Sequence, residues 1–176
     1  MAKKTLAFKK GDKVIHPFHG GGVVVDIVEK EHGDQTNEYF LINILNDTLS
    51  LYVPTESLDR VNIKKIESKD VLDSCLTLMR KNSFKLIPNP TPLENKVREK
   101  IKQGGLVALS EAIGLICKFK SKREKEGKIT PLNKNLTDLL NHAKKLFISQ
   151  LALIQDMQYT SAHSYLQEIL EKNSSA

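Results

Sequence analysis

The spacing of apolar residues changes near Ser68, and the change divides the chain into two parts with different secondary structure. Before it, short runs rich in Val, Ile, Leu and Tyr alternate apolar with polar residues, which is typical of β-strands with one buried face. After it, apolar residues such as Leu72 and Leu76 recur every three or four positions, which predicts helices. We therefore expect an α+β chain with two domains, residues 1–64 and residues 65–176.

The first domain is predicted to be a small β-barrel. Its strand candidates are DKVIHP, GVVVDIVEKE, NEYFLINIL and LSLYVP, and Asn46-Asp47 between the last two suits a hairpin turn. Four or five such short strands cannot build a β-sandwich in this length of chain. An SH3-like or Tudor-like barrel fits better, because its strong curvature lets short strands enclose one small core.

The second domain is predicted to be a bundle of about five α-helices. The segment NSFKLIPNPTP separates the first two helices, and the residues TPLE at 91–94 have the form of a capping box that would start the second. Gly104-Gly105 would end that helix, and the next helix would run into KFKSKREKEGK. Thr130-Pro131 would open the fourth helix, and Thr160 or Ser161 would cap the last.

The stretch VIHPFHGGGVVV interrupts the strand pattern with two histidines and three glycines. A His-x-x-His pair suggests a metal site, but His16 and His19 have no further candidate ligand close to them in the sequence. A phosphate loop would lead into a helix, whereas this one leads into a strand. A tight corner between two strands is the interpretation that we favour, because glycines allow positive φ and close backbone approach. We expect neither a metal nor a cofactor.

The net charge of +6 is unevenly distributed along the chain. Residues 1–60 hold 7 Lys+Arg against 9 Asp+Glu, whereas residues 61–176 hold 20 against 12. A basic surface attracts phosphate backbones, and a nearly neutral β-domain suits a protein partner. No apolar run approaches the ~20 residues of a membrane span, so we expect a cytoplasmic protein with no membrane partner. No nucleophile stands beside a base in a recognisable motif, so we expect no enzyme.

Several stretches together resemble one family. FKKGDKVIHPFHGGGVVVDI, followed by NEYFLINI and LSLYVPTES, resembles the RNA-polymerase-interacting domain of the CarD/CdnL family of bacterial transcription factors, which is also found in transcription-repair coupling factors. EKIKQGG and ISQLALIQD are similar to the helical domain of CarD-type proteins. The resemblance implies a nucleoid-associated factor without catalysis, expected to be a monomer. Its β-domain would bind the β subunit of RNA polymerase, and its helical domain would contact promoter DNA, largely without sequence specificity, and stabilise the open complex.

The resemblance implies that the polymerase contacts are Lys30, Glu31, Tyr52 and Pro54. Members of the family often carry a basic residue where Tyr52 stands, so this chain departs from the pattern at that position. The alternative interpretation is that Tyr52 covers the surface of the barrel and Lys30 is a solvated charge.

For DNA, the family uses a tryptophan at the start of a helix as a wedge in the minor groove at the upstream edge of the bubble. That position aligns with about Pro90, and this chain contains no tryptophan. Phe84, Leu86 or Leu93 could insert instead, because other apolar side chains also unstack base steps. The alternative, which we favour, is that all three pack in the hinge and the core.

Basic residues after this region are the candidate DNA contacts. Such contacts position a protein without reading sequence, so the expected binding is weak and sensitive to salt. The alternative is a solvated helix end that Glu124 and Glu126 partly neutralise. The candidates are Lys96, Arg98, Lys100, Lys102, Lys118, Lys120, Lys122, Arg123 and Lys125.

A rival function stays open at this point. The chain could be a protein-interaction adaptor that binds polymerase or another partner while its bundle engages no DNA, and the missing tryptophan supports that reading. A Tudor-like reader of modified side chains would need an aromatic cage. Phe18, Tyr39, Phe40 and Tyr52 are too few aromatic residues to favour it.

Overall fold

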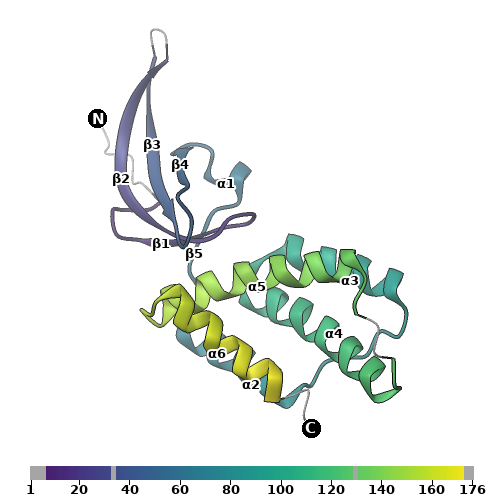
Figure 1. Cartoon of the computed structure of the whole chain (residues 1–176). Coiled ribbons are helices and arrows are strands. Elements are labelled where there is room, and N and C mark those ends of the chain that lie inside the picture. Colours follow the sequence, from purple (N-terminus) through teal and green to yellow (C-terminus); the bar gives the residue numbers. More distant parts are fainter. Residues whose placement is uncertain (1–6, 33–34, 129–130, 173–176) are drawn as a thin grey trace. The chain divides into compact units, whose positions relative to one another are not determined.

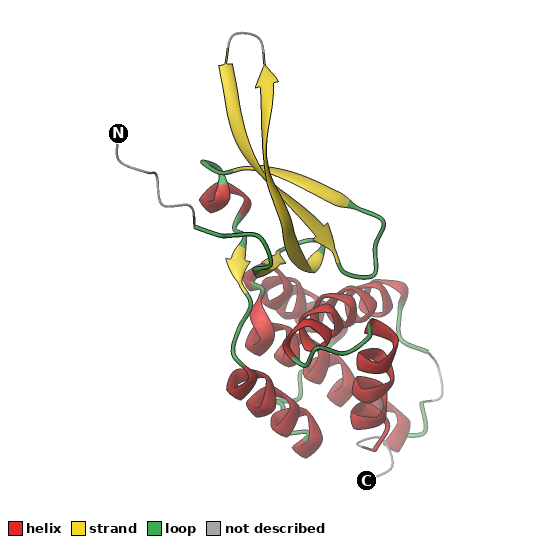
Figure 2. Cartoon of the chain, turned by 90° about the vertical axis from the view of Figure 1, so that its left-hand side faces the viewer, coloured by secondary structure: helices red, strands yellow, loops and turns green. Residues whose placement is uncertain are grey.

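The structure is a computed structural model that describes residues 7–32, 35–128 and 131–172. The chain falls into two compact units, residues 1–66 and residues 67–176, and each is described by itself. Among the described residues, the strands lie in the first unit and the elements of the second unit are helices, which Figure 2 distinguishes by colour. The predicted α+β class is confirmed.

Five strands of the first unit form one antiparallel sheet in the order β4-β3-β2-β1-β5 among the described residues. β4 and β5 are therefore the two edges of this sheet, and Figure 1 shows β2 and β3 as its long, curved strands. The strand runs predicted from the alternating pattern are confirmed, and a short helix and a two-residue strand follow them. The elements are β1 (Lys13–His16), β2 (Gly20–His32), β3 (Gln35–Ile44), β4 (Ser50–Pro54), α1 (Leu58–Val61) and β5 (Lys64–Lys65).

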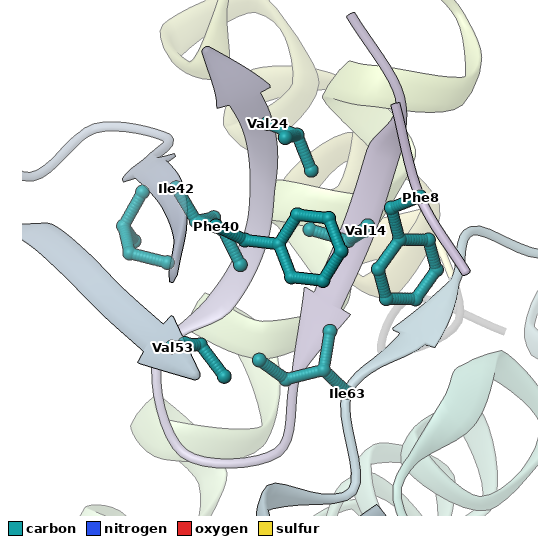
Figure 3. Packing of buried hydrophobic residues seen from close by; sticks show 8 residues of the cluster. Phe8, Val14, Val24, Phe40, Ile42, Val53 and Ile63 are labelled. Carbon is teal, nitrogen blue, oxygen red and sulfur yellow. The ribbon is translucent and has the colours of Figure 1, made fainter. Parts of the chain in front are cut away.

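The core of the first unit is built from apolar residues of strands β1 to β4, together with Phe8 and Ile63, which lie outside the strands (Figure 3). Phe40 is fully buried, and its ring meets that of Phe8 edge to face with the centroids 5.6 Å apart. Burying a side chain of this size contributes about 1.5–3 kcal/mol, so a few such residues hold this small sheet together. The buried cluster comprises Phe8, Val14, Val24, Phe40, Ile42, Ile44, Val53 and Ile63.

A β-bulge in β2 decides which of its side chains face this core. The register shifts between Val24 and Asp26, which makes Val25 the extra residue. Without the bulge, the alternation that buries Val24 would also bury the carboxylate of Asp26. With it, Asp26 stays exposed and Ile27 packs against the core instead.

The predicted tight corner between β1 and β2 is confirmed. Gly20 takes a φ of +89°, a conformation that other residues rarely adopt. A Cβ atom on Gly22 would lie 2.7 Å from the backbone carbonyl oxygen of Asn43 on β3, so only glycine lets the two strands approach this closely.

The second unit is a bundle of five helices within the described residues, as predicted. α4 packs against α2, α3 and α5, and its buried residues lie on most sides of the helix. It is therefore the central element, in keeping with its run of apolar residues. The helices are α2 (Lys69–Lys81), α3 (Pro90–Gln103), α4 (Gly105–Lys125), α5 (Lys134–Ile154) and α6 (Tyr159–Lys172).

The capping box predicted for α3 is wrong, although the helix itself and its end at Gly104 are confirmed. α3 begins one residue before Thr91, which therefore lies inside the helix and caps nothing. Glu94 bonds elsewhere: its carboxylate accepts hydrogen bonds from the side-chain amides of Asn133 (2.9 Å) and Asn135 (3.3 Å). The acid thus ties α3 to α5.

Two other predicted helix starts also differ. α5 is capped by Asn133, whose side-chain oxygen accepts a hydrogen bond from the N–H of Leu136 at 2.8 Å. The predicted cap, Thr130, lies outside the described residues. Thr160 and Ser161 lie within the first turn of α6 and do not precede it.

The segment between α2 and α3 is attached to α4. A Cβ atom on Gly114 would lie 2.3–2.5 Å from ring carbons of Phe84, so the phenyl ring occupies the space that a side chain there would need. The Nζ atom of Lys118 donates to the backbone carbonyl of Asn82 at 3.4 Å. These contacts fix the segment against the bundle.

Candidate functional site

Two of the predicted polymerase contacts meet on the outer face of the sheet. Tyr52 on β4 lies opposite Leu41 of β3, whose side chain alternates with the buried Phe40, so Tyr52 faces away from the core. The Nζ atom of Lys30 on β2 lies 3.2 Å from the centroid of the Tyr52 ring. The structure therefore brings together two residues from strands that are not adjacent in the sheet.

This cation–π contact sits at an edge of the sheet. Such a contact on an exposed surface contributes about 0.5–1 kcal/mol, enough to hold both side chains in one arrangement for much of the time. Tyr52 still exposes 48% of its surface, and β4 is an edge strand among the described residues. A partner could therefore reach an ordered aromatic residue and an unpaired strand side at the same place.

The other two predicted contacts are placed differently. Pro54 pairs with Tyr39 at the end of β4, two residues from Tyr52 and on the same face of the sheet. Glu31 directly follows Lys30 in β2, so its exposed side chain points to the opposite face. Pro54 thus extends the Lys30–Tyr52 surface, and Glu31 does not.

The aromatic cage of a Tudor-like reader does not fit this arrangement. Phe40 is fully buried in the core of the sheet. Phe18 exposes 72% of its surface but lies in the β1–β2 corner, away from β4 in the order of strands. Tyr52 is already covered by Lys30 on one face.

His16 shapes the β1–β2 corner in a way that the sequence did not reveal. Its Nδ1 atom accepts hydrogen bonds from the backbone N–H groups of Phe18 (3.1 Å) and His19 (3.3 Å). Burial, and secondly the charge of His19, lower the pKa of His16 to about 4, so its imidazole is neutral at physiological pH. The Nδ1 lone pair of this neutral imidazole accepts the two N–H groups of the turn and so is not available to bind a metal ion. Within the part of the chain that the structure describes, no group of three or more His, Cys, Asp or Glu side chains could hold a metal ion.

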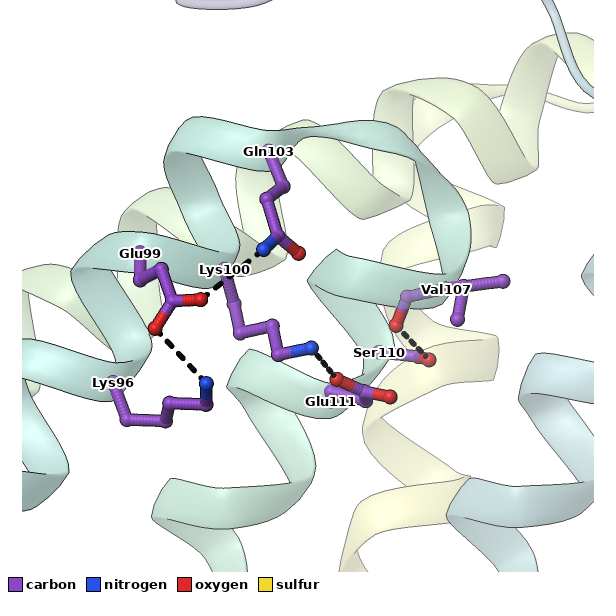
Figure 4. Close-up of polar contacts among 7 residues, drawn as sticks. All are labelled: Lys96, Glu99, Lys100, Gln103, Val107, Ser110 and Glu111. Carbon is purple, nitrogen blue, oxygen red and sulfur yellow. Dashed lines mark hydrogen bonds and ion pairs between the residues drawn. The ribbon is translucent and has the colours of Figure 1, made fainter.

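The four predicted DNA contacts on α3 occupy two sides of the helix by their spacing, and Figure 4 shows the side that carries Lys96 and Lys100. Lys96 pairs with Glu99 at 2.9 Å, and Lys100 reaches across to Glu111 on α4. Arg98 and Lys102 are exposed and form no ion pair with any described residue. They are thus the cations of α3 that need break no existing pair to meet a phosphate.

The predicted contacts near the end of α4 are also partly engaged. Lys120 lies 3.7 Å from Glu124, and Lys122 lies 3.4 Å from Glu126. Exposed pairs of this kind contribute about 0–1 kcal/mol, so a phosphate can replace the carboxylate at small cost. Lys118 is held by the Asn82 carbonyl, the guanidinium of Arg123 lies 5.7 Å from the Phe119 ring, and Lys125 is exposed.

The wedge hypothesis does not fit Leu93, which is fully buried in the bundle. Phe84 is half-buried and seated against Gly114, and Leu86 is half-buried in the same segment. Packing, the alternative favoured from the sequence, describes Leu93 and Phe84 better than insertion into DNA does.

Comparison with known proteins bears on the first unit most directly. Residues 8–67 match the family model of the CarD-like/TRCF RID domain. These residues form a CarD-like domain. The resemblance inferred from the GDKVIHPFHG stretch and the strands that follow it is therefore confirmed.

A curated relative extends the similarity beyond the CarD-like domain. The protein named "Putative transcription factor YdeB" of Bacillus subtilis (strain 168) is 23% identical over 159 residues, which cover 90% of this chain and 99% of that protein. The similarity to that protein thus includes the helical unit as well as the CarD-like domain. No helix among the described residues is long and apolar enough to cross a membrane.

Proposed function

We propose that the chain is a non-enzymatic bacterial transcription factor that binds the β subunit of RNA polymerase through its CarD-like domain. Its helical unit contacts promoter DNA largely without sequence specificity and so stabilises the open complex. The observation that carries the proposal is the Lys30–Tyr52 pair beside edge strand β4 of a CarD-like domain. The protein acts in the cytoplasm, on the nucleoid, as a monomer.

The surface around Tyr52 has the properties of a protein-binding site. Tyrosine is enriched among the residues that dominate binding energy at interfaces, and this one is both exposed and held in place by Lys30. An edge strand can add a strand from a partner, with main-chain hydrogen bonds supplying affinity and side chains such as Pro54 supplying specificity.

DNA contact is supported by the exposed cations of α3 and α4. Arg98, Lys102 and Lys125 are exposed without ion pairs among the described residues. The pairs of Lys120 and Lys122 are at the surface and can be exchanged for phosphates. Such contacts release counterions and bind any duplex, so they supply affinity rather than sequence preference.

The adaptor function remains the second candidate because many of the predicted DNA-binding lysines already have acidic partners. Lys96, Lys100, Lys120 and Lys122 each pair with a glutamate. The chain also lacks tryptophan, the residue that the family uses as a wedge.

Fluorescence anisotropy of a labelled, forked promoter fragment separates the two functions, measured with and without RNA polymerase of the same host. The test variant is Arg98→Glu/Lys102→Glu/Lys125→Glu. The matched control, Lys10→Glu/Lys64→Glu/Lys65→Glu, makes the same change in net charge on exposed residues of the first unit. If the chain is a transcription factor that contacts DNA, the test variant should bind the promoter fragment more weakly than the wild type does. The magnitude of the slope of log affinity against log salt concentration should also fall by roughly 2–3. Equal affinities for the two variants, with polymerase binding retained, would favour the adaptor.

A further inference from the structure

A groove of about 300 Å³ lies in the helical unit beside the cations already described. One wall is the segment between α2 and α3, and the others are α3 and α4. Figure 4 shows the α3–α4 side, where Lys100 reaches Glu111 next to the Lys96–Glu99 pair. The residues that line the groove are Ser83, Phe84, Lys85, Ile87, Lys96, Lys100, Glu111 and Leu115.

The apolar part of the groove includes a fixed aromatic ring. Phe84 is seated against Gly114, where even one added methyl group would collide with it, and Ile87 and Leu115 complete the apolar lining. A ring that is already ordered can stack a flat apolar group without first losing conformational freedom. Nucleobases are such groups, and stacking on an aromatic side chain raises affinity by roughly 5- to 150-fold per base.

The charged part of the groove suits a phosphate and the edge of a base. Lys85 is exposed and makes no ion pair within the described ranges, and Lys96 has only a surface pair to give up. Lys100 and Glu111 are paired with each other, so this wall presents a hydrogen-bond donor next to an acceptor. A base edge carries both kinds of group, whereas a simple anion would be repelled by Glu111.

We propose that this groove receives one unpaired nucleotide of a DNA strand. The base would lie against Phe84 and Ile87, the flanking phosphate on Lys85 and Lys96, and the base edge on Lys100 and Glu111. A base inside a duplex cannot enter such a recess unless it leaves the stack, so the groove selects DNA that is already melted. Here the protein accepts a base instead of inserting a side chain into DNA, which suits a chain without tryptophan.

This inference rests on the proposed DNA contact and makes it more specific. The exposed cations would hold any duplex, whereas the groove would add affinity only for a junction with an unpaired strand. The ratio of fork affinity to duplex affinity therefore reports on the groove, because phosphate contacts common to both cancel in that ratio.

The test compares two variants of the full-length chain that make the same kind of change. Ile87→Glu places a carboxylate in the groove, and Leu78→Glu places one on α2 outside the groove lining. Leu78 is exposed, so the control should fold normally. Binding of a fork with one unpaired thymidine strand and of the corresponding full duplex is measured by anisotropy. A second readout needs no variant: 5-iodouracil in the unpaired strand is photo-crosslinked to the wild-type chain, and the attached residue is mapped by mass spectrometry.

We expect the wild type and Leu78→Glu to bind the fork roughly tenfold more tightly than the duplex. Ile87→Glu should bind both equally, and the crosslink should map to Phe84. Equal binding of fork and duplex by the wild type, or a ratio unchanged in Ile87→Glu, overturns the inference while leaving DNA contact intact. Absence of binding to either DNA overturns the proposed DNA contact as well. Competition by thymidine monophosphate at concentrations as low as those of the fork would show that a free nucleotide is the ligand, which also overturns the inference.

Discussion

Gly114→Ala should destabilise the helical unit of the wild-type chain. In a chain that already carries Phe84→Ala, the same substitution should stabilise it instead. The added Cβ atom would lie 2.3 Å from ring carbons of Phe84, much closer than ordinary van der Waals contact, so the ring must move away from α4. Overpacking of this kind costs about 1–3 kcal/mol. Alanine is itself the better helix former by about 1 kcal/mol, so the net loss should be at most about 2 kcal/mol.

In the Phe84→Ala background the collision is gone, and the helix preference of alanine remains. Gly114→Ala should then stabilise the chain by up to about 1 kcal/mol, which makes the coupling energy between the two sites equal to the overpacking cost of about 1–3 kcal/mol. Urea unfolding of the wild type, both single variants and the double variant measures this cycle directly. A Gly114→Ala effect that is the same in both backgrounds would refute the packing of Phe84 on α4.

Two further predictions concern the corner at His16 and the start of α4. The pKa of His16 is lowered to about 4 in the folded chain, so the unfolded chain binds more protons between that pH and about 6.5. The contribution of neutral His16 to the free energy of unfolding is therefore fully present at neutral pH and is lost on acidification through that range. Urea midpoints should show a loss of about 1–3 kcal/mol from pH 7 to pH 4.5. His16→Asn, which keeps an acceptor that does not titrate there, should lose clearly less, and equal losses would speak against the assignment. Glu67→Ala removes the carboxylate that accepts the N–H of Leu106 at the start of α4, so unfolding should be easier by about 0.5–2 kcal/mol, against under about 0.5 kcal/mol for the exposed control Glu99→Ala. Matching midpoints for those two variants would show that the contact does not stabilise the helix.

The elements that local pattern decides could be predicted. Phe40, Ile42 and Ile44 recur at every second position of β3, and all three are buried in the core of the sheet, as the period of a strand predicts. Leu72 and Leu76 fall on one helix face and are both buried. Each of these outcomes depends on residues a few positions apart.

The first residue of each helix was harder to predict, because several nearby residues have side chains that could cap it. Thr91 has the right chemistry, yet α3 starts before it, and Glu94 is engaged by Asn133 from α5. Asn133 in turn caps α5. These outcomes depend on contacts between helices that are far apart in sequence, which capping rules based on neighbouring residues do not take into account.

The candidate sites show the same division. The resemblance implied that Lys30 and Tyr52 lie at one interface, but their mutual contact depends on the register in which β2 and β4 pair with β3 between them. The groove around Phe84 was missed because a glycine inside a helix gave no sign of which side chain would fill its place. Nor could the sequence show that Lys100 is paired with Glu111 while Arg98 is exposed.

Binding of the purified full-length chain to the RNA polymerase β subunit of its own host tests the central claim most directly. Biolayer interferometry should compare the wild type with Tyr52→Ala and with Phe18→Ala, which removes another exposed aromatic residue of the same unit. The account predicts measurable binding that Tyr52→Ala weakens roughly tenfold or more and Phe18→Ala leaves unchanged. No binding by the wild type, or equal affinities for the two variants, would contradict it.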